Sequence, residues 1–198
     1  MPFDIDTPTG GGESGPFIQW QAKESTDGNI PGRSWVLRDS LGVKSVVKFF
    51  DAGVVMDFEN LKTGWCYSTG TAGTAPQWKW NANPRKFDPQ PAEINGITWK
   101  RGISLPLAFG PKPTDRAVWE QAQAGAWSAF AALVAVLKAS NPPAGKYPVI
   151  KQDGVEKIES KRGITFAPKL GLLKWVDCPP ALQGALAAVD TGDDDVPF

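Results

Sequence analysis

The apolar residues of this chain fall into short runs, and each run is closed by residues that break regular structure. The 198 residues include 21 glycines and 18 prolines. Together with Asn and Asp they separate stretches rich in β-branched and aromatic side chains, a pattern typical of strands. Strands are therefore predicted at 17–23, 33–39, 43–50, 53–59, 61–68, 77–81, 96–109, 146–151, 155–166 and 169–176.

Alternation is clearest around two pairs of aromatic residues. Trp65 and Tyr67 are two positions apart, as are Trp78 and Trp80, so each pair is expected to share one face of a strand. Trp20 and Trp35 stand among apolar neighbours instead, which assigns both to the core.

One long helix interrupts the strands, from about residue 115 to residue 139, with Thr114 as N-cap and Lys138 near the negative end of the dipole. Apolar side chains recur at helical spacing and form a stripe that is expected to pack against the sheet. The stripe consists of Val118, Trp119, Ala122, Ala126, Ala129, Phe130, Leu133 and Leu137. The residues at 141–145 end the helix, and a second short helix is possible after Pro179 and Pro180.

Many short strands, one inserted helix and no βαβ repeat predict a small antiparallel barrel, closed or partly closed. Residues 1–15 read as a flexible leader, 16–184 as one folded domain and 185–198 as an acidic tail. Cys66 and Cys178 are interpreted as reduced thiols in or near the core of a cytoplasmic protein. Nothing resembles a secretory signal or a membrane span.

The chain contains no histidine, which removes the commonest general base and the commonest metal ligand. No phosphate-cradling loop, nucleophile elbow or metal-ligand cluster is recognisable. We therefore expect a protein that is not an enzyme and that needs no cofactor or metal.

The charge of the chain is divided unevenly. The 21 basic and 21 acidic residues cancel overall, but residues 1–15 hold three acids and the segment after Gly184 holds four, with no base in either. The body between them therefore has 14 acids against 21 bases, a net charge of +7. A basic body of this kind attracts polyanions such as nucleic acid.

The chain ends in a run of carboxylates followed by an apolar aromatic residue that carries the terminal carboxylate. Adjacent aspartates repel one another, so this end is expected to be solvated and free for a partner to bind. It consists of Asp193, Asp194, Asp195, Val196, Pro197 and Phe198. This tip resembles the C-terminal peptide of bacterial and phage single-stranded DNA-binding proteins (SSB). With almost no linker between the folded pattern and the acidic tail, the chain looks more like the diverged phage replication type.

The resemblance covers about six residues. It implies an oligonucleotide-binding (OB) fold, hence a mainly β, OB-fold-like antiparallel barrel with one long inserted helix and a disordered acidic tail. It also implies single-stranded DNA as the ligand, in replication, recombination or repair. The tip would recruit a polymerase, primase, helicase or nuclease in the cytoplasm of a bacterial host cell.

Single strands are held by rings that stack on bases and by cations that follow the phosphates. Nine tryptophans are present, several beside basic residues. The densest stretch is 77–87, followed by 65–74, which leads into a flexible loop, and by 99–101. The candidate contacts are Trp78, Lys79, Trp80, Arg85, Lys86, Phe87, Trp65, Tyr67, Trp99, Lys100 and Arg101.

Two other functions explain part of the pattern. Exposed tryptophans also stack on sugar rings, as in a carbohydrate-binding β-domain, but such a domain leaves the basic body and acidic tip without a purpose. A phage assembly or structural protein would use the tail as a docking peptide and the tryptophans for packing. It would show no salt-dependent affinity for nucleic acid.

Overall fold

The computed structural model describes residues 16–26, 28–71, 74–110, 112–113, 115–160 and 163–183. The predicted leader, residues 1–15, and the predicted tail, residues 185–198, lie outside these ranges. Ten strands and three helices are assigned within them. They are β1 (Phe17–Gln21), β2 (Ser34–Arg38), β3 (Lys44–Val47), α1 (Phe49–Ala52), β4 (Val54–Met56), β5 (Lys62–Tyr67), β6 (Gln77–Trp80), β7 (Lys100–Phe109), β8 (Asp115–Gln121), α2 (Ala124–Ala139), β9 (Tyr147–Ser160), β10 (Gly163–Val176) and α3 (Pro180–Gln183).

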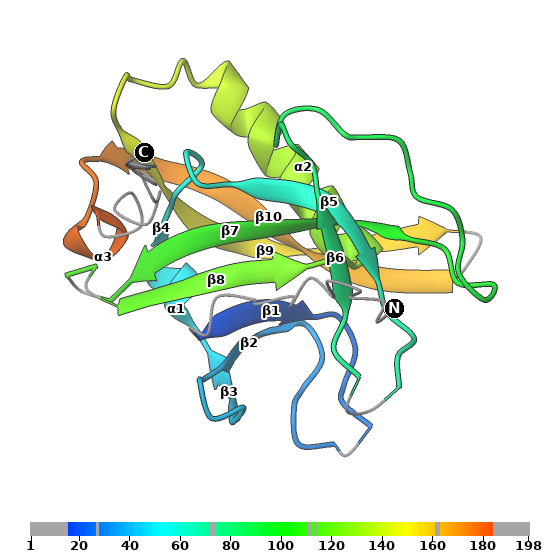
Figure 1. Cartoon of the computed structure of the whole chain (residues 1–198). Helices are drawn as coiled ribbons and strands as arrows, with labels where there is room; N and C mark the ends of the chain where they lie inside the picture. The colour runs from blue at the N-terminus through cyan, green and yellow to red at the C-terminus, as the bar shows by residue number, and fades with distance from the viewer. Residues whose placement is uncertain are drawn as a thin grey trace, which may run out of the picture.

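The strands form one curled sheet in the order β10-β9-β4-β7-β8-β1-β2-β3, with β5 and β6 branching from it (Figure 1). The branch arises because the first half of β7 pairs with β5 and its second half pairs with β4. The protein is therefore mainly β, as predicted. One difference is that β1 and β8 run parallel, so the sheet is not wholly antiparallel.

Side chains, rather than a further strand ladder, join the first strands to the last ones. The indole Nε1 of Trp20 donates to the Phe166 carbonyl at 2.8 Å, and that of Trp35 donates to Oε1 of Gln152 at 2.8 Å. The Arg33 guanidinium lies 3.8 Å from the centre of the Phe166 ring. The sheet is thus a curled half-barrel in which two tryptophans and a cation–π contact join β1 and β2 to β9 and β10.

The concave side of the sheet holds the main core, and α2 packs there against β10 and β7. Trp20 and Trp35 are 1% and 3% exposed, which confirms their predicted place in the core. Trp35 stacks on Phe50 at 4.1 Å and meets Trp119 edge to face. These large rings fill the space that the curl of the sheet encloses.

The Trp20→Phe variant is expected to lose about 1–3 kcal/mol of unfolding free energy. The phenyl ring fills most of the site, but the Phe166 carbonyl loses its indole donor. Urea unfolding measures the change. Trp175→Phe is the matched control, because its indole N–H has no hydrogen-bond partner among the described residues. An equal loss in both variants would mean that the hydrogen bond of Trp20 contributes nothing to closure.

The long helix predicted from residue 115 is corrected by the structure. Residues 115–121 form β8, and α2 begins at Ala124 with Gln123, not Thr114, at the N-cap. In β8 the buried residues alternate as Ala117, Trp119 and Gln121, facing their partners on β7. Trp119 fits both a helical and a strand spacing, and pairing with β7 decides between them.

Three strand predictions differ in extent. The end of the predicted strand 43–50 forms α1. The predicted strand 146–151 joins the first part of the predicted strand 155–166 as β9, and residues 163–166 begin β10. A register shift between Lys169 and Leu170 absorbs an extra residue in β9, so the strand bends instead of ending.

The last described helix, α3, packs on the convex side of the sheet, which we call the outer face. Leu182 is buried there with Val55, Ala108, Tyr147 and Val149. The described chain therefore ends on the outer face, at Gln183. Among the described residues, no helix has the length and apolar character needed to cross a bilayer.

Candidate nucleic-acid interface

Two tryptophans of β6 stack on each other at the edge of the outer face. The rings of Trp78 and Trp80 are 4.5 Å apart with 10° between their planes, and both are half-buried. Strand register places Trp78 beside Cys66 of β5, which in turn is opposite Lys100 of β7. The predicted sharing of a face by Trp78 and Trp80 is confirmed, and a lysine lies on the same face.

Two glycines explain how the indoles come to lie against the sheet. Gly64 and Gly102 are directly paired between β5 and β7, in the row that also contains Trp80. A Cβ on Gly102 would overlap the six-membered ring of Trp78, and a Cβ on Gly64 would overlap the Lys79 carbonyl. Close approach of ring and backbone therefore requires glycine at both positions. Neither glycine was among the predicted site residues, although glycine inside a strand pattern is a signal for such contact.

The candidates Trp65 and Tyr67 lie on the other side of β5 and are 6% and 7% exposed. Trp65 donates its indole N–H to the Asp88 carbonyl and meets Phe87 edge to face at 5.4 Å. Tyr67 packs against Trp99 at 5.5 Å. These rings hold the 81–99 segment against the sheet, and this packing leaves little ring surface for a base.

Polar side chains anchor the start of the 81–99 segment. Asn81 donates to Thr63 Oγ1 at 2.8 Å, and Thr63 Oγ1 donates to the Pro84 carbonyl at 2.9 Å. Phe87 then reaches α2 and meets Trp127 edge to face at 5.2 Å. The segment is thus fixed to β5 through Thr63 and to α2 through Trp127.

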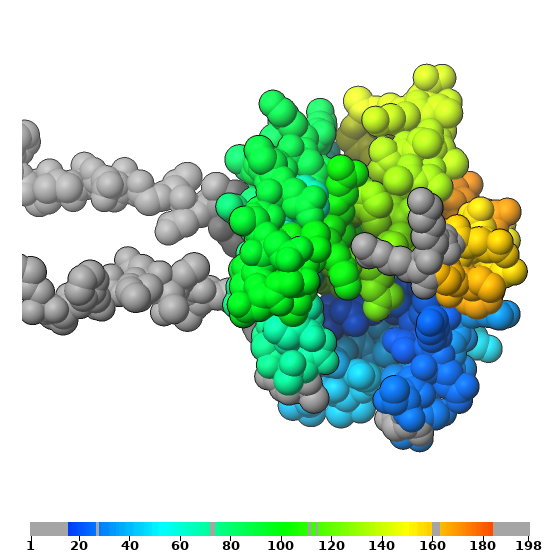
Figure 2. All heavy atoms as spheres, turned by 90° about the vertical axis from the view of Figure 1, so that its right-hand side faces the viewer, coloured from blue at the N-terminus to red at the C-terminus, as the bar shows by residue number. Residues whose placement is uncertain are grey.

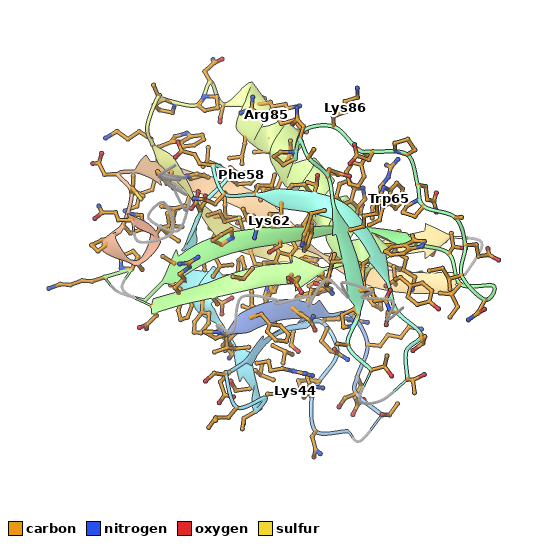
Figure 3. The ribbon with its side chains drawn as sticks, in the orientation of Figure 1. Lys44, Phe58, Lys62, Trp65, Arg85 and Lys86 are labelled. Carbon is orange, nitrogen blue, oxygen red and sulfur yellow. The ribbon has the colours of Figure 1, made fainter. Side chains whose placement is uncertain are left out.

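The predicted cations are distributed over different surfaces. Arg101 lies on the same side as Trp65, with its guanidinium 5.1 Å from the Phe87 ring centre. Arg85 and Lys86 are exposed on the 81–99 segment, near α2 in Figure 3, where Lys86 extends away from the ribbon. Lys79 is exposed on the side of β6 opposite Trp78. Of the predicted contacts, the structure therefore brings Trp78, Trp80 and Lys100 together on the outer face.

The outer face also holds cations that the sequence analysis did not select. Lys62, at the start of β5, pairs with Ser104 and lies over the middle of the sheet in Figure 3. Further along the same face are Arg38 of β2 and Lys44 of β3, which are directly opposite each other. No local motif marks them, because pairing between β8, β1 and β2 brings them to this face.

A hollow separates two parts of the molecule in Figure 2, which faces the right-hand end of Figure 1. One side is formed by β6 and the segment after it, drawn in green, and the other by the loop of residues 22–33, drawn in blue. Atoms of the N-terminal strands are visible between them. Figure 2 thus shows β6 and the loop between β1 and β2 on either side of a hollow at this end of the molecule.

Burial decides the chemistry of Cys66, the neighbour of Trp78. Its thiol is 6% exposed, and burial together with the Glu120 carboxylate raises the pKa of Cys66 to about 11, while Lys100 acts in the opposite direction. A thiol with this pKa is almost fully protonated at neutral pH and is a poor nucleophile. The free cysteines Cys66 and Cys178 are consistent with the predicted reduced thiols in or near the core.

In a Cys178→Ser background, Cys66 is expected to react slowly with a disulfide reagent at pH 8, because its thiolate fraction is small. Raising the pH from 9 to 11 should accelerate labelling steeply and lower the unfolding free energy, since the folded state holds the proton more tightly than the unfolded state. Trp78→Ala should also accelerate labelling by uncovering the thiol. Labelling at the rate of a free thiol at pH 8 would contradict this environment.

No group of three potential metal-ligating side chains lies together in the described part of the chain. No protein-family profile, curated protein or solved structure matches the sequence or the fold.

Proposed function

We propose that this protein binds single-stranded DNA without sequence preference, through the outer face of an OB-fold-like half-barrel. The observation that carries the proposal is the half-buried Trp78 and Trp80 stack beside Lys100, on a face that also presents Lys62. Indole rings stack on any base and lysines attract any phosphate, so this combination tolerates every sequence. The net charge of +7 on the body adds long-range attraction.

The acidic tip from Asp193 to Phe198 has a separate role in this proposal. It recruits a replication, recombination or repair protein, which would bind the Phe198 ring in an apolar pocket and its carboxylate with a basic side chain. The protein itself performs no catalytic step and works in the cytoplasm, where its two free cysteines stay reduced.

Fluorescence titration with an oligothymidylate, and with duplex DNA of equal length, tests the proposal at low and high salt. We expect strong quenching by the single strand that weakens with salt, and little response to the duplex. Because nine tryptophans contribute to the signal, the same titration of a Trp78→Phe and Trp80→Phe variant identifies the part that comes from the stacked pair. No response to either nucleic acid would reject the proposal.

The same titration separates the alternatives. A sugar-binding site would also use the stacked indoles, so quenching by an oligosaccharide but not by DNA would favour a carbohydrate-binding domain. An assembly protein would respond to neither ligand. Salt-dependent quenching by DNA alone separates the proposed function from both.

A further inference from the structure

A small pocket opens on the outer face at the N-terminal end of the sheet. Gln19 of β1 and Val36 of β2 are directly paired and form part of its lining. Ser25 and Ile30 line it from the loop that joins these strands, and two hydrogen bonds between them close that loop. The pocket is thus built on a strand pair and braced by a closed turn.

The open side of the pocket is basic. Arg38 and Lys44 both line it and are directly opposite each other on β2 and β3. Phe17 is the partner of Arg38 on the other side, and its ring centre lies 5.4 Å from the guanidinium. One row across three strands therefore places an aromatic ring, a guanidinium and an ammonium side by side.

The positive charges of Arg38 and Lys44 repel each other, and no described carboxylate neutralises them. Like charges at directly opposite positions of an antiparallel pair repel each other. Among the described residues, no acidic side chain lies within ion-pair distance of Arg38 or Lys44. An anion placed between the two cations would remove the repulsion and gain hydrogen bonds from the guanidinium.

We propose that this pocket is a phosphate subsite, and that it receives a backbone phosphate of the single strand held by Trp78 and Trp80. Arg38 supplies a planar fork of donors that matches phosphate oxygens, and Lys44 supplies a point charge. Phe17 packs against the guanidinium. Gln19 also lines the pocket, and its side-chain amide donates to the Glu120 carbonyl at 3.1 Å. This inference rests on the proposed function and extends the binding surface from β6 to β3.

The position of the pocket fits a bound DNA strand that runs across the sheet. β6, with its stacked indoles, lies at one end of the branch through β5, and β2 and β3 lie at the other end of the order β7-β8-β1-β2-β3. Figure 3 shows Lys62 over the middle of the sheet and Lys44 near β3. A strand that starts on the indoles would pass the middle of the outer face before it reaches the pocket.

The test compares the wild type with an Arg38→Gln and Lys44→Gln variant. The affinity of each protein for an oligothymidylate of about 16 nucleotides is measured over a range of salt concentrations. This length is near the upper site size of one OB fold. The plot of log affinity against log salt has a negative slope. Losing two phosphate contacts should make this slope shallower by about 1.4, at ~0.7 per contact for single strands. The ratio of wild-type to variant affinity should then be about 25-fold larger at 0.1 M salt than at 1 M.

Lys169→Gln together with Lys174→Gln provides the matched control, because it removes two exposed cations from β10 and none from the outer pocket. The control variant should keep the wild-type slope of log affinity against log salt, apart from the small change caused by its lower net charge. The melting temperature of the Arg38 and Lys44 variant should equal or exceed that of the wild type, since a like-charge pair has been removed.

The outcomes separate the subsite from the proposed function. If the wild type binds the oligonucleotide and the variant behaves like the control, the subsite is rejected and the proposed function stands. If the wild type does not bind the oligonucleotide, both fail. Thymidine monophosphate is used as a second ligand, beside the oligothymidylate. Saturable binding of this nucleotide that the variant loses, with an unchanged oligonucleotide slope, would assign the pocket to free nucleotides and reject the strand contact.

Discussion

Replacing Trp78 and Trp80 together by Ala is expected to weaken binding of single-stranded DNA by about 1–3 kcal/mol for each ring that stacks on a base. The two indoles are stacked on each other, half-buried and supported from below by Gly102. The pair therefore presents a preformed aromatic surface that loses little freedom when a base binds. Fluorescence anisotropy of a labelled oligothymidylate at fixed salt measures the loss.

The salt dependence distinguishes this variant from the pocket variant. Removing the two indoles takes away no phosphate contact, so the slope of log affinity against log salt should stay at the wild-type value. Trp80→Phe should retain much of the affinity, because a phenyl ring still stacks on a base. A folded double variant with unchanged affinity would exclude Trp78 and Trp80 from the binding surface.

Part of the fold was accessible from the sequence because the signals are local. The two-residue period placed Trp78 and Trp80 on one face, and apolar neighbours assigned Trp20 and Trp35 to the core. The residues around Trp119 were assigned wrongly, because they fit helical and strand spacing equally well. The partner strand that resolves such an ambiguity is itself a product of the fold.

The candidate site was harder to predict because strand order brings distant segments together. Arg38 and Lys44 reach the outer face through β2 and β3, whereas the stacked indoles reach it through β6. Trp65 was also a predicted contact, and nothing local shows that Phe87 and Asp88 return to cover its ring. Density of aromatic and basic residues thus identified the stretch that carries the stacked indoles of β6, without separating the two faces of the sheet.

Deleting residues 193–198 is expected to abolish recruitment of a replication protein and to leave DNA affinity equal or higher. The deletion removes three aspartates and leaves the terminal carboxylate on Gly192, so less negative charge is tethered to the body. The described chain ends at α3, on the outer face where we propose that DNA binds. Any gain in affinity should therefore be largest at low salt and disappear at high salt.

Two full-length variants separate the contributions of ring and charge in this tip. Phe198→Ala removes the ring, so it should lose partner binding. It keeps all three aspartates, so it should keep wild-type DNA affinity. Replacing Asp193, Asp194 and Asp195 by Asn keeps the ring, so it should raise DNA affinity at low salt. Surface plasmon resonance with purified polymerase, primase, helicase and nuclease measures recruitment. A marked fall in DNA affinity on deletion would show that the tip belongs to the DNA-binding surface, because a competing anion cannot strengthen the binding that it opposes.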